Sequence, residues 1–203
     1  GGRIVPSFTR NWLVRQGIQH LPASFRNTDK AAIGLTAAAV IAWVALPDDG
    51  ATGFLLLAAG MAQFVRLARW QGWRTAREPI VLILHLGYAW LALALALMGL
   101  AILRPDLLGA SIAMHALTAG AIGTMTIAVM TRATLGHTGR EIAADRGTKS
   151  IYLLVTLGAL LRVAAAWLPG DYIHWVSLAG TLWSLGLLFF AVQYGRYLTS
   201  PRR

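Results

Sequence analysis

Hydrophobic residues gather in six long runs along the chain, separated by short segments rich in Pro, Gly, Asp and Arg. A helix of about 20 apolar residues crosses a hydrocarbon core about 30 Å thick, and it satisfies its own backbone hydrogen bonds. The runs therefore predict membrane-spanning helices. We expect a six-helix transmembrane domain over residues 29–203, preceded by a cytoplasmic or interfacial segment over residues 1–28. The predicted spans cover residues 30–46, 51–70, 79–103, 109–131, 150–168 and 172–195.

The composition supports this pattern. Of the 203 residues, 57% are hydrophobic and only 13% are charged, whereas about 25% of residues are charged in a typical soluble domain. The sequence therefore predicts an all-α, polytopic transmembrane bundle whose main partner is the lipid bilayer.

The positive charges predict the orientation of the bundle. The net charge is +10, and all but two of the 18 Lys and Arg residues lie before or at the start of the first span, at or near alternate connections between spans, or after the last span. The exceptions are Arg104 and Arg162. Because Lys and Arg concentrate on the cytoplasmic side of membrane proteins, we expect both termini to be cytoplasmic. The basic residues orient the protein in this interpretation, so no nucleic-acid partner is expected.

Three of the predicted spans contain a histidine, and ionisable side chains are costly inside a bilayer and need partners there. The third span contains His85, the fourth contains His115, and the sixth begins with His174. The chain has no cysteine, so a metal would be bound by His, Met, Tyr, carboxylate or backbone oxygen. The alternative is that each histidine simply forms a hydrogen bond between helices. His174 heads a stripe that also contains Ser177, Thr181 and Ser184, and we expect this stripe to face the bundle interior.

Arg162 is the one charge well inside a predicted span. It needs a carboxylate, backbone carbonyl groups or an anionic ligand such as a haem propionate, unless it extends to the outer interface. No acidic residue falls inside any predicted span, so its partner is expected to be a ligand or another part of the protein. Arg66 and Arg69 are expected to extend to the inner interface.

The heights of the histidines indicate two layers. At 1.5 Å per residue, His85 lies about 9 Å to the cytoplasmic side of its span's midpoint, and His115 about 8 Å to the outer side. Two axial ligands of one iron lie only about 4 Å apart, given bonds near 2 Å. We therefore predict that these two histidines do not bind the same iron. His115, Arg162 and His174 form the outer layer.

Residues 132–140 are predicted to form a polar, basic loop that contains His137. This histidine is a metal ligand, a switch or a solvated loop residue. The chain has no P-loop, nucleophile elbow, zinc-protease or paired-carboxylate pattern, so the question of catalysis stays open.

Three stretches resemble the NnrS family: HALTAGAIGTMTIAVMTRATLGHTGR from His115 to Arg140, the opening GGRIVPSFTRNWL, and LILHLGYAWL in the third span. The resemblance implies a longer bacterial inner-membrane protein, associated with haem b and copper, that relieves nitrosative stress. This chain resembles its C-terminal half, so a missing N-terminal half is an expected partner. His85, His115 and His137 lie in the family's motifs and are candidate metal ligands, while His85, His115, Arg162 and His174 are candidate haem-binding residues.

The leading hypothesis is therefore a haem- and copper-binding membrane protein. It would limit damage by nitric oxide, either by binding or converting that molecule at haem or by changing metal availability. The second hypothesis is a transporter or exporter of metal or haem, with a polar path along the sixth span. The third is a structural or assembly protein whose histidines only form hydrogen bonds.

Overall fold

A computed structural model describes residues 2–202, which form helices and connecting loops, with no strand in that range. The elements are α1 (Ile4–Arg15), α2 (Asn27–Ala45), α3 (Gly50–Arg69), the 3-10 helix η1 (Gly72–Thr75), α4 (Pro79–Leu103), α5 (Ala110–His115), the π-helix η2 (Ala116–Gly123), α6 (Thr124–His137), α7 (Arg146–Ala164) and α8 (Tyr172–Thr199).

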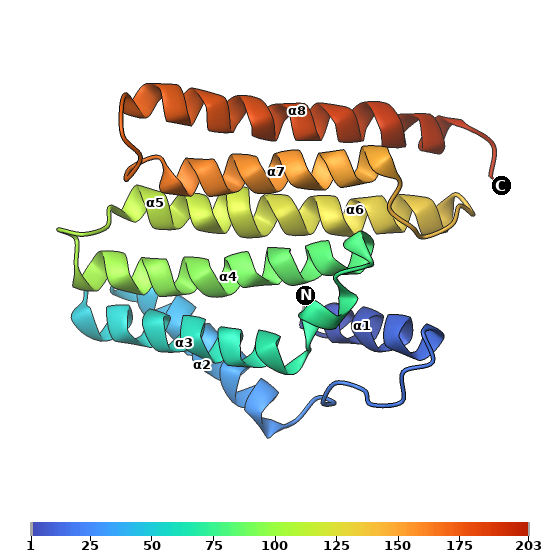
Figure 1. The fold of residues 1–203 in the computed structure, drawn as a ribbon. Coiled ribbons are helices and arrows are strands. Elements are labelled where there is room, and N and C mark those ends of the chain that lie inside the picture. Colours follow the sequence, from blue (N-terminus) through green and yellow to red (C-terminus); the bar gives the residue numbers. More distant parts are fainter. Residues whose placement is uncertain (1, 203) are drawn as a thin grey trace.

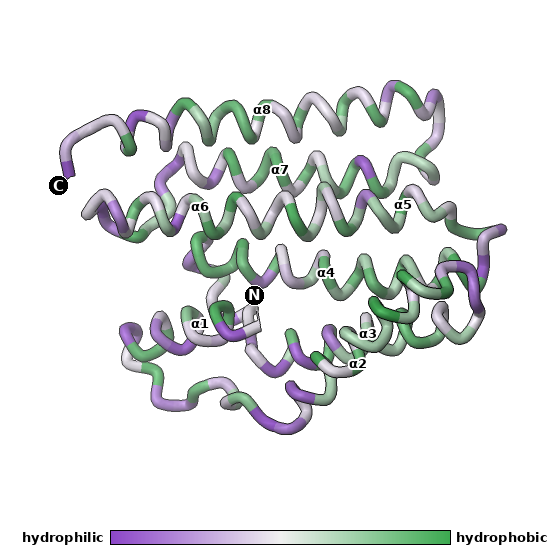
Figure 2. Tube along the Cα trace, turned by 180° about the vertical axis from the view of Figure 1, so that it is seen from behind, coloured by the Kyte–Doolittle hydropathy of each residue, from purple (hydrophilic) through white to green (hydrophobic). Residues whose placement is uncertain are grey.

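Six helical segments within residues 2–202 are long and apolar enough to cross a membrane, because α5, η2 and α6 form one continuous segment. They lie side by side in a row that runs from α8 through α7, α5–α6 and α4 to α3 and α2 (Figure 1). Hydrophobic residues extend along the helices, and hydrophilic residues gather in the connection between α1 and α2 (Figure 2). The predicted all-α bundle with six spans is confirmed. The cytoplasmic position of the termini stays a prediction.

The fourth span is longer than the hydropathy pattern predicted. Helix α6 continues to His137, so most of the basic segment that was predicted to be a loop is helical. The helix continues because Thr134 and Leu135 are buried against the rest of the bundle. It ends where Gly139 adopts a φ of 73° and the Arg140 N–H donates to the Leu135 carbonyl at 3.0 Å. This arrangement is a Schellman motif, in which glycine takes the left-handed conformation without a steric penalty.

Small residues allow the helices to pack closely. A Cβ placed on Gly60 of α3 would lie 2.6 Å from the Ala96 nitrogen of α4. A Cβ on Gly158 of α7 would lie 2.8 Å from the Trp183 nitrogen of α8. Contacts this close exclude any side chain, and they are typical of membrane helices, whose association depends on packing.

The middle of the fourth span is a π-helix of 8 residues. Gly120 lies against the indole of Trp90, and Gly123 against the indole of Trp183. A π-helix widens the turn and leaves the regular α-helical hydrogen-bond pattern, and such segments are frequent at functional sites. Here the widened turn seats two tryptophans from the flanking helices α4 and α8.

Asp145 joins the start of α7 to α8. Its Oδ1 accepts the Thr148 N–H at 2.7 Å, and both carboxylate oxygens accept from Gln193 Nε2 at 3.0 Å. Burial acts to raise the pKa of Asp145, but hydrogen bonds from Thr148, Gln193 and Tyr197 outweigh it and lower the pKa below the ordinary value of 3.8. The ionised carboxylate is therefore the form that stabilises this end of the bundle.

Replacing Gly60 with alanine is expected to destabilise the protein by about 1–3 kcal/mol, because the added methyl group overpacks the α3–α4 contact. Reversible unfolding in mixed detergent micelles measures this change. Gly180→Ala in α8 is the matched control, because no atom lies within 4 Å of the added Cβ there. The control should be neutral or slightly stabilising, and an equal loss in both variants would contradict the packing explanation.

The stability that Asp145 contributes should depend on pH. Because its pKa is lower in the folded protein, the contribution is fully present above about pH 4, the range of a free Asp, and is lost as the pH falls through the folded value. Unfolding measured from pH 7 to pH 3 should show a steeper loss in the wild type than in Asp145→Asn. Parallel curves for the two proteins would refute this role.

Candidate functional site

A buried ion pair connects α2 and α3. Arg66 Nε donates to Asp29 Oδ1 at 2.8 Å, and each of the two residues is only 3% exposed. Arg69 lies 3.5 Å from the other carboxylate oxygen. The expectation that Arg66 extends to the interface was wrong, because its guanidinium turns inward to this carboxylate. The expectation that no acid lies inside a span was also wrong, because α2 begins at Asn27 and includes Asp29.

The remaining donors of Arg66 extend the network to α4 and to the start of the chain. Nη1 donates to the Tyr88 hydroxyl at 2.9 Å, and Nη2 donates to the Gly2 carbonyl at 3.0 Å. The indole of Trp70 lies under the guanidinium, with 5.1 Å between the Arg66 Cζ atom and the ring centroid. Four separate parts of the chain therefore meet at one arginine.

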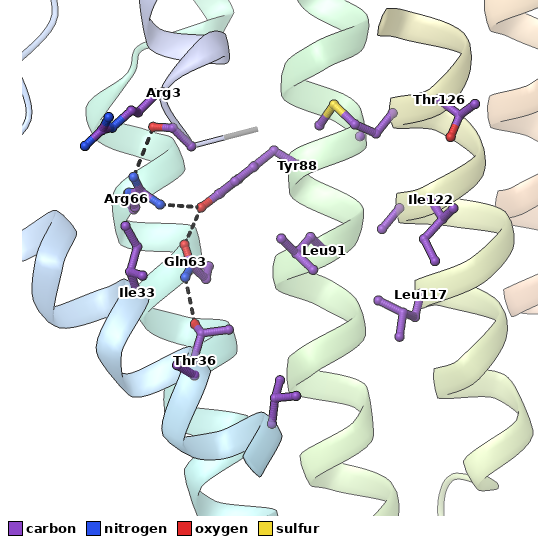
Figure 3. A pocket seen from close by; sticks show the side chains of 16 residues that line it. Arg3, Ile33, Thr36, Gln63, Arg66, Tyr88, Leu91, Leu117, Ile122 and Thr126 are labelled. Atoms are coloured by element: carbon purple, nitrogen blue, oxygen red, sulfur yellow. Dashed lines mark hydrogen bonds between the residues drawn. The ribbon is translucent and has the colours of Figure 1, made fainter. Parts of the chain in front are cut away.

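Gln63 continues the network along α3. The Tyr88 hydroxyl donates to its Oε1, and its Nε2 donates to Thr36 Oγ1 at 2.7 Å and to the Ala32 carbonyl at 3.2 Å (Figure 3). The pattern of polar residues in the sequence did not identify Asp29, Gln63, Arg66 and Tyr88 as a group. The available signal was a Gln one turn before an arginine in the second span, together with a Tyr inside the third span.

A cavity of about 830 Å³ lies beside this network, between α2 and α3 on one side and η2 and α6 on the other. Arg3, Arg66, Gln63 and Tyr88 lie at its polar end, and Leu91, Leu117 and Ile122 extend along its apolar part (Figure 3). We call it the α2–α6 cavity. Its volume lies within the range of about 300–1,000 Å³ that is common for ligand pockets.

His85 is enclosed between α1, η1 and α4 and does not line this cavity. The Thr9 hydroxyl donates to the Val5 carbonyl at 2.9 Å, so it accepts the N–H of His85 Nε2, which lies 2.7 Å away. His85 Nδ1 then carries the lone pair, and it is buried with no hydrogen-bond partner among the described residues. A Cβ on Gly72 would lie 2.5 Å from both Cγ and Nδ1 of His85, so the Gly72 backbone packs tightly against the imidazole ring.

His115 and His174 have a different environment. His115 is half-exposed, and its Nδ1 lies 2.6 Å from the Ser111 carbonyl of the preceding turn. His174 is exposed, and its Nδ1 lies 3.0 Å from Asp171 Oδ2. In both cases the acceptor favours a proton on Nδ1 and leaves Nε2 with the lone pair. This arrangement is the one that orients histidines as metal ligands.

Arg162 and His174 lie at the same corner of the bundle, where α7 ends and α8 begins. Arg162 Nη1 donates to the Tyr172 hydroxyl at 3.2 Å. His115 lies at the same end of the row, with α7 between α5 and α8 (Figure 1). His137 is exposed at the opposite end, where α6 ends. Within residues 2–202, no three His, Asp or Glu side chains gather around one point.

His85 and His115 are well separated in height. Gly87 of α4 lies against Met125 of α6, because an added Cβ would be 3.2 Å from the Met125 nitrogen. The two helices are antiparallel, with His85 two residues before Gly87 and His115 ten residues before Met125. The offset of twelve residues corresponds to about 18 Å at 1.5 Å per residue. This separation agrees with the heights expected from the sequence.

The polar stripe of α8 faces away from the bundle, contrary to the prediction. The side chains of Ser177, Thr181 and Ser184 are all exposed. The face of α8 that contacts α7 is formed instead by Ala179, Trp183 and Gly186, which fit against Gly158 and Val155. The small residues Gly158, Ala179 and Gly186 allow α7 and α8 to approach closely. The buried face of α8 is therefore set by the size of its side chains and not by their polarity.

Together the row of apolar helices, the buried network and the adjacent cavity define a multi-pass helical membrane protein with a ligand-sized pocket between its helices. The family model described as NnrS protein matches residues 1–202, so the chain belongs to the NnrS family. Searches of curated proteins and of solved structures gave no match.

Arg66→Met should destabilise the protein by about 3–5 kcal/mol, because it leaves the Asp29 carboxylate buried without its partner. The double variant Asp29→Leu/Arg66→Met removes both charges and should recover much of this loss. Unfolding free energies of the two variants in mixed micelles test the prediction. If the double variant is no more stable than Arg66→Met, the burial of an unpaired charge is not the cause.

Proposed function

We propose that this protein is a bacterial inner-membrane protein of the nitric oxide response, which binds haem and copper and limits nitrosative damage. Membership of the NnrS family supports the class of function, since the resemblance to that family implies both cofactors. The observation that carries the proposal is the orientation of His115 and His174, each with Nδ1 beside an acceptor.

These two histidines fit as metal ligands, and each would offer the lone pair of Nε2. Helix α7 lies between α5 and α8, so we propose that they belong to separate sites at the predicted outer end (Figure 1). Each site would be completed by donors outside residues 2–202, because no cluster of three ligands occurs within that range. Those donors would come from the expected N-terminal half or from another copy.

Arg162 fits as the partner of an anionic group on a cofactor. One of its N–H groups donates to Tyr172, and a guanidinium has five N–H donors, so others remain for a propionate. In this proposal Tyr172 orients Arg162 at the corner that also contains His174. The anionic group of the ligand would then compensate the positive charge of Arg162.

His85 does not fit as a haem ligand in this structure. Its Nε2 donates to Thr9, its Nδ1 is buried, and the ring packs tightly against the backbone of Gly72, so a macrocycle has no access to either nitrogen. We propose that its role is to fix α1 against α4. His137 is exposed at the end of α6, so it stays a candidate copper ligand on the predicted cytoplasmic side.

A haem iron with an open position would supply the capacity to bind nitric oxide. The chain would supply the ligand lone pairs, the cation beside the propionates and an apolar surrounding that excludes water. A transport path along α8 is not favoured, because the polar stripe that suggested it faces away from the other helices.

The test is the visible spectrum and the metal content of the protein purified from membranes of cells supplied with haem and copper. We expect a Soret band that shifts on addition of nitric oxide. His115→Ala and His174→Ala should each lower the haem or copper content by at least half. His20→Ala is the matched control, because His20 is an exposed histidine on the connection between α1 and α2.

Two further results bear on the proposal. His85→Ala should keep the haem and copper content and lower only the thermal stability. Wild-type protein with neither haem nor copper, from cells that load both into other proteins, would refute the proposed function.

A further inference from the structure

We propose that the α2–α6 cavity is a binding site for an anionic phospholipid of the bilayer. Its phosphate would lie at Arg3 and Arg66, and one acyl chain would lie along the apolar part of the cavity. The inference rests on the charge, shape and position of this cavity, and it does not depend on haem or copper.

The polar end of the cavity carries excess positive charge. Arg3 and Arg66 line it, and Arg69 lies just behind, 3.5 Å from Asp29. Asp29 pairs with Arg66 and Arg69, so together with Arg3 this end of the cavity has three cations and one anion. Within residues 2–202, Arg3 forms no salt bridge, and its side chain is exposed. Three cations and one anion give this end a net charge of +2, which a phosphate with one negative charge would lower to +1.

Arg66 is a buried and fixed donor at this end. Three of its N–H groups are used by Asp29, Tyr88 and the Gly2 carbonyl. A guanidinium has five N–H groups, so two remain, and hydrogen bonds from such groups to phosphate are among the strong ones in proteins. Because the ion pair and the Trp70 ring hold the guanidinium in place, binding would not require it to be ordered first.

The rest of the cavity suits an acyl chain. From Arg3 and Arg66 it extends past Leu91 to Leu117, toward the middle of the spans (Figure 3). Its sides are formed by Ile33 and Val40 of α2 and by Ile122 of η2, which are 44%, 40% and 57% exposed. These partly exposed side chains show that the cavity opens sideways between the helices, in the direction where lipid lies.

The depth of the charges also matches a lipid headgroup. Arg66 and Arg69 are in the last turn of α3, Asp29 is in the first turn of α2, and Arg3 precedes α1. This is the predicted cytoplasmic end of the bundle, and basic pockets between helices on that side are known to bind anionic lipid headgroups. A free phosphate ion would use the arginines but would leave the apolar part of the cavity without a function.

The first experiment counts the lipids that remain on the purified protein and measures their effect. Protein in mild detergent is extracted, and its lipids are identified by mass spectrometry. Thermal unfolding is then followed during titration with dioleoylphosphatidylglycerol, dioleoylphosphatidylcholine or inorganic phosphate. We expect about one anionic phospholipid for each chain, and an unfolding temperature that rises with phosphatidylglycerol and with neither of the other probes.

Variants then assign the effect to the cavity. Arg3→Gln should weaken the apparent affinity for phosphatidylglycerol roughly fivefold, the loss typical of one basic residue near an anionic lipid. Arg15→Gln is the matched control, because it removes the same charge from an exposed position at the other end of α1 and should change nothing. Ala37→Trp keeps every charge but fills the cavity from its exposed wall, and it should abolish retention of the lipid.

Several results would overturn the proposal. Equal weakening by Arg3→Gln and Arg15→Gln would indicate general attraction of the lipid to a basic surface. Lipid retained by a folded Ala37→Trp protein would place the lipid elsewhere. If phosphatidylcholine raised the unfolding temperature as much as phosphatidylglycerol does, the site would bind a neutral lipid. If inorganic phosphate raised it as much, the site would bind a free anion. Arg66 is left unchanged in all variants, because replacing it would remove the partner of the buried Asp29 carboxylate and destabilise the protein for a reason unrelated to lipid binding.

Discussion

The ion pair between Arg66 and Asp29 is the interaction on which the first half of the bundle depends. Taking two charges out of water costs several kcal/mol for each ion, and the cost is offset only where the geometry is good and the remaining donors are used. Here the guanidinium is bonded to Asp29, Tyr88 and Gly2 and stacks on Trp70. Helices α2, α3 and α4 and the start of the chain must therefore adopt one relative arrangement to satisfy a single side chain.

This constraint also creates the α2–α6 cavity. Helix α2 is held against the C-terminal end of α3 by the ion pair and by the bonds from Gln63 to Thr36 and Ala32. The space between α2 and the fourth span is left unfilled by side chains. Arg3, Arg66 and the polar network lie at one end of the cavity, and apolar side chains line the rest. The cavity is therefore amphiphilic, with charge at one end only.

Histidines at the two ends of the bundle differ in what surrounds them. His85 is closed in by Thr9 and Gly72 and serves the packing of α1. His115 and His174 each have one nitrogen beside an oxygen acceptor and the other turned away from it. Histidines in similar apolar spans therefore differ in whether they can bind a metal, and the difference comes from the residues around each one. This difference, and the family to which the chain belongs, underlie the proposed assignment of the metal sites.

The sequence by itself determined the class of fold, the number of spans and the family, because long apolar runs and a continuous motif are local properties that need no partner to be recognised. The third span was predicted at the same residues as α4, since Pro79 and Arg104 mark its ends. The tertiary structure alone decided that Arg66 turns inward, that the α8 stripe faces outward, that the fourth span contains a π-helix and that it continues to His137. Each of these depends on which side chain from a distant segment comes into contact, and hydropathy along one helix contains no information about its neighbour.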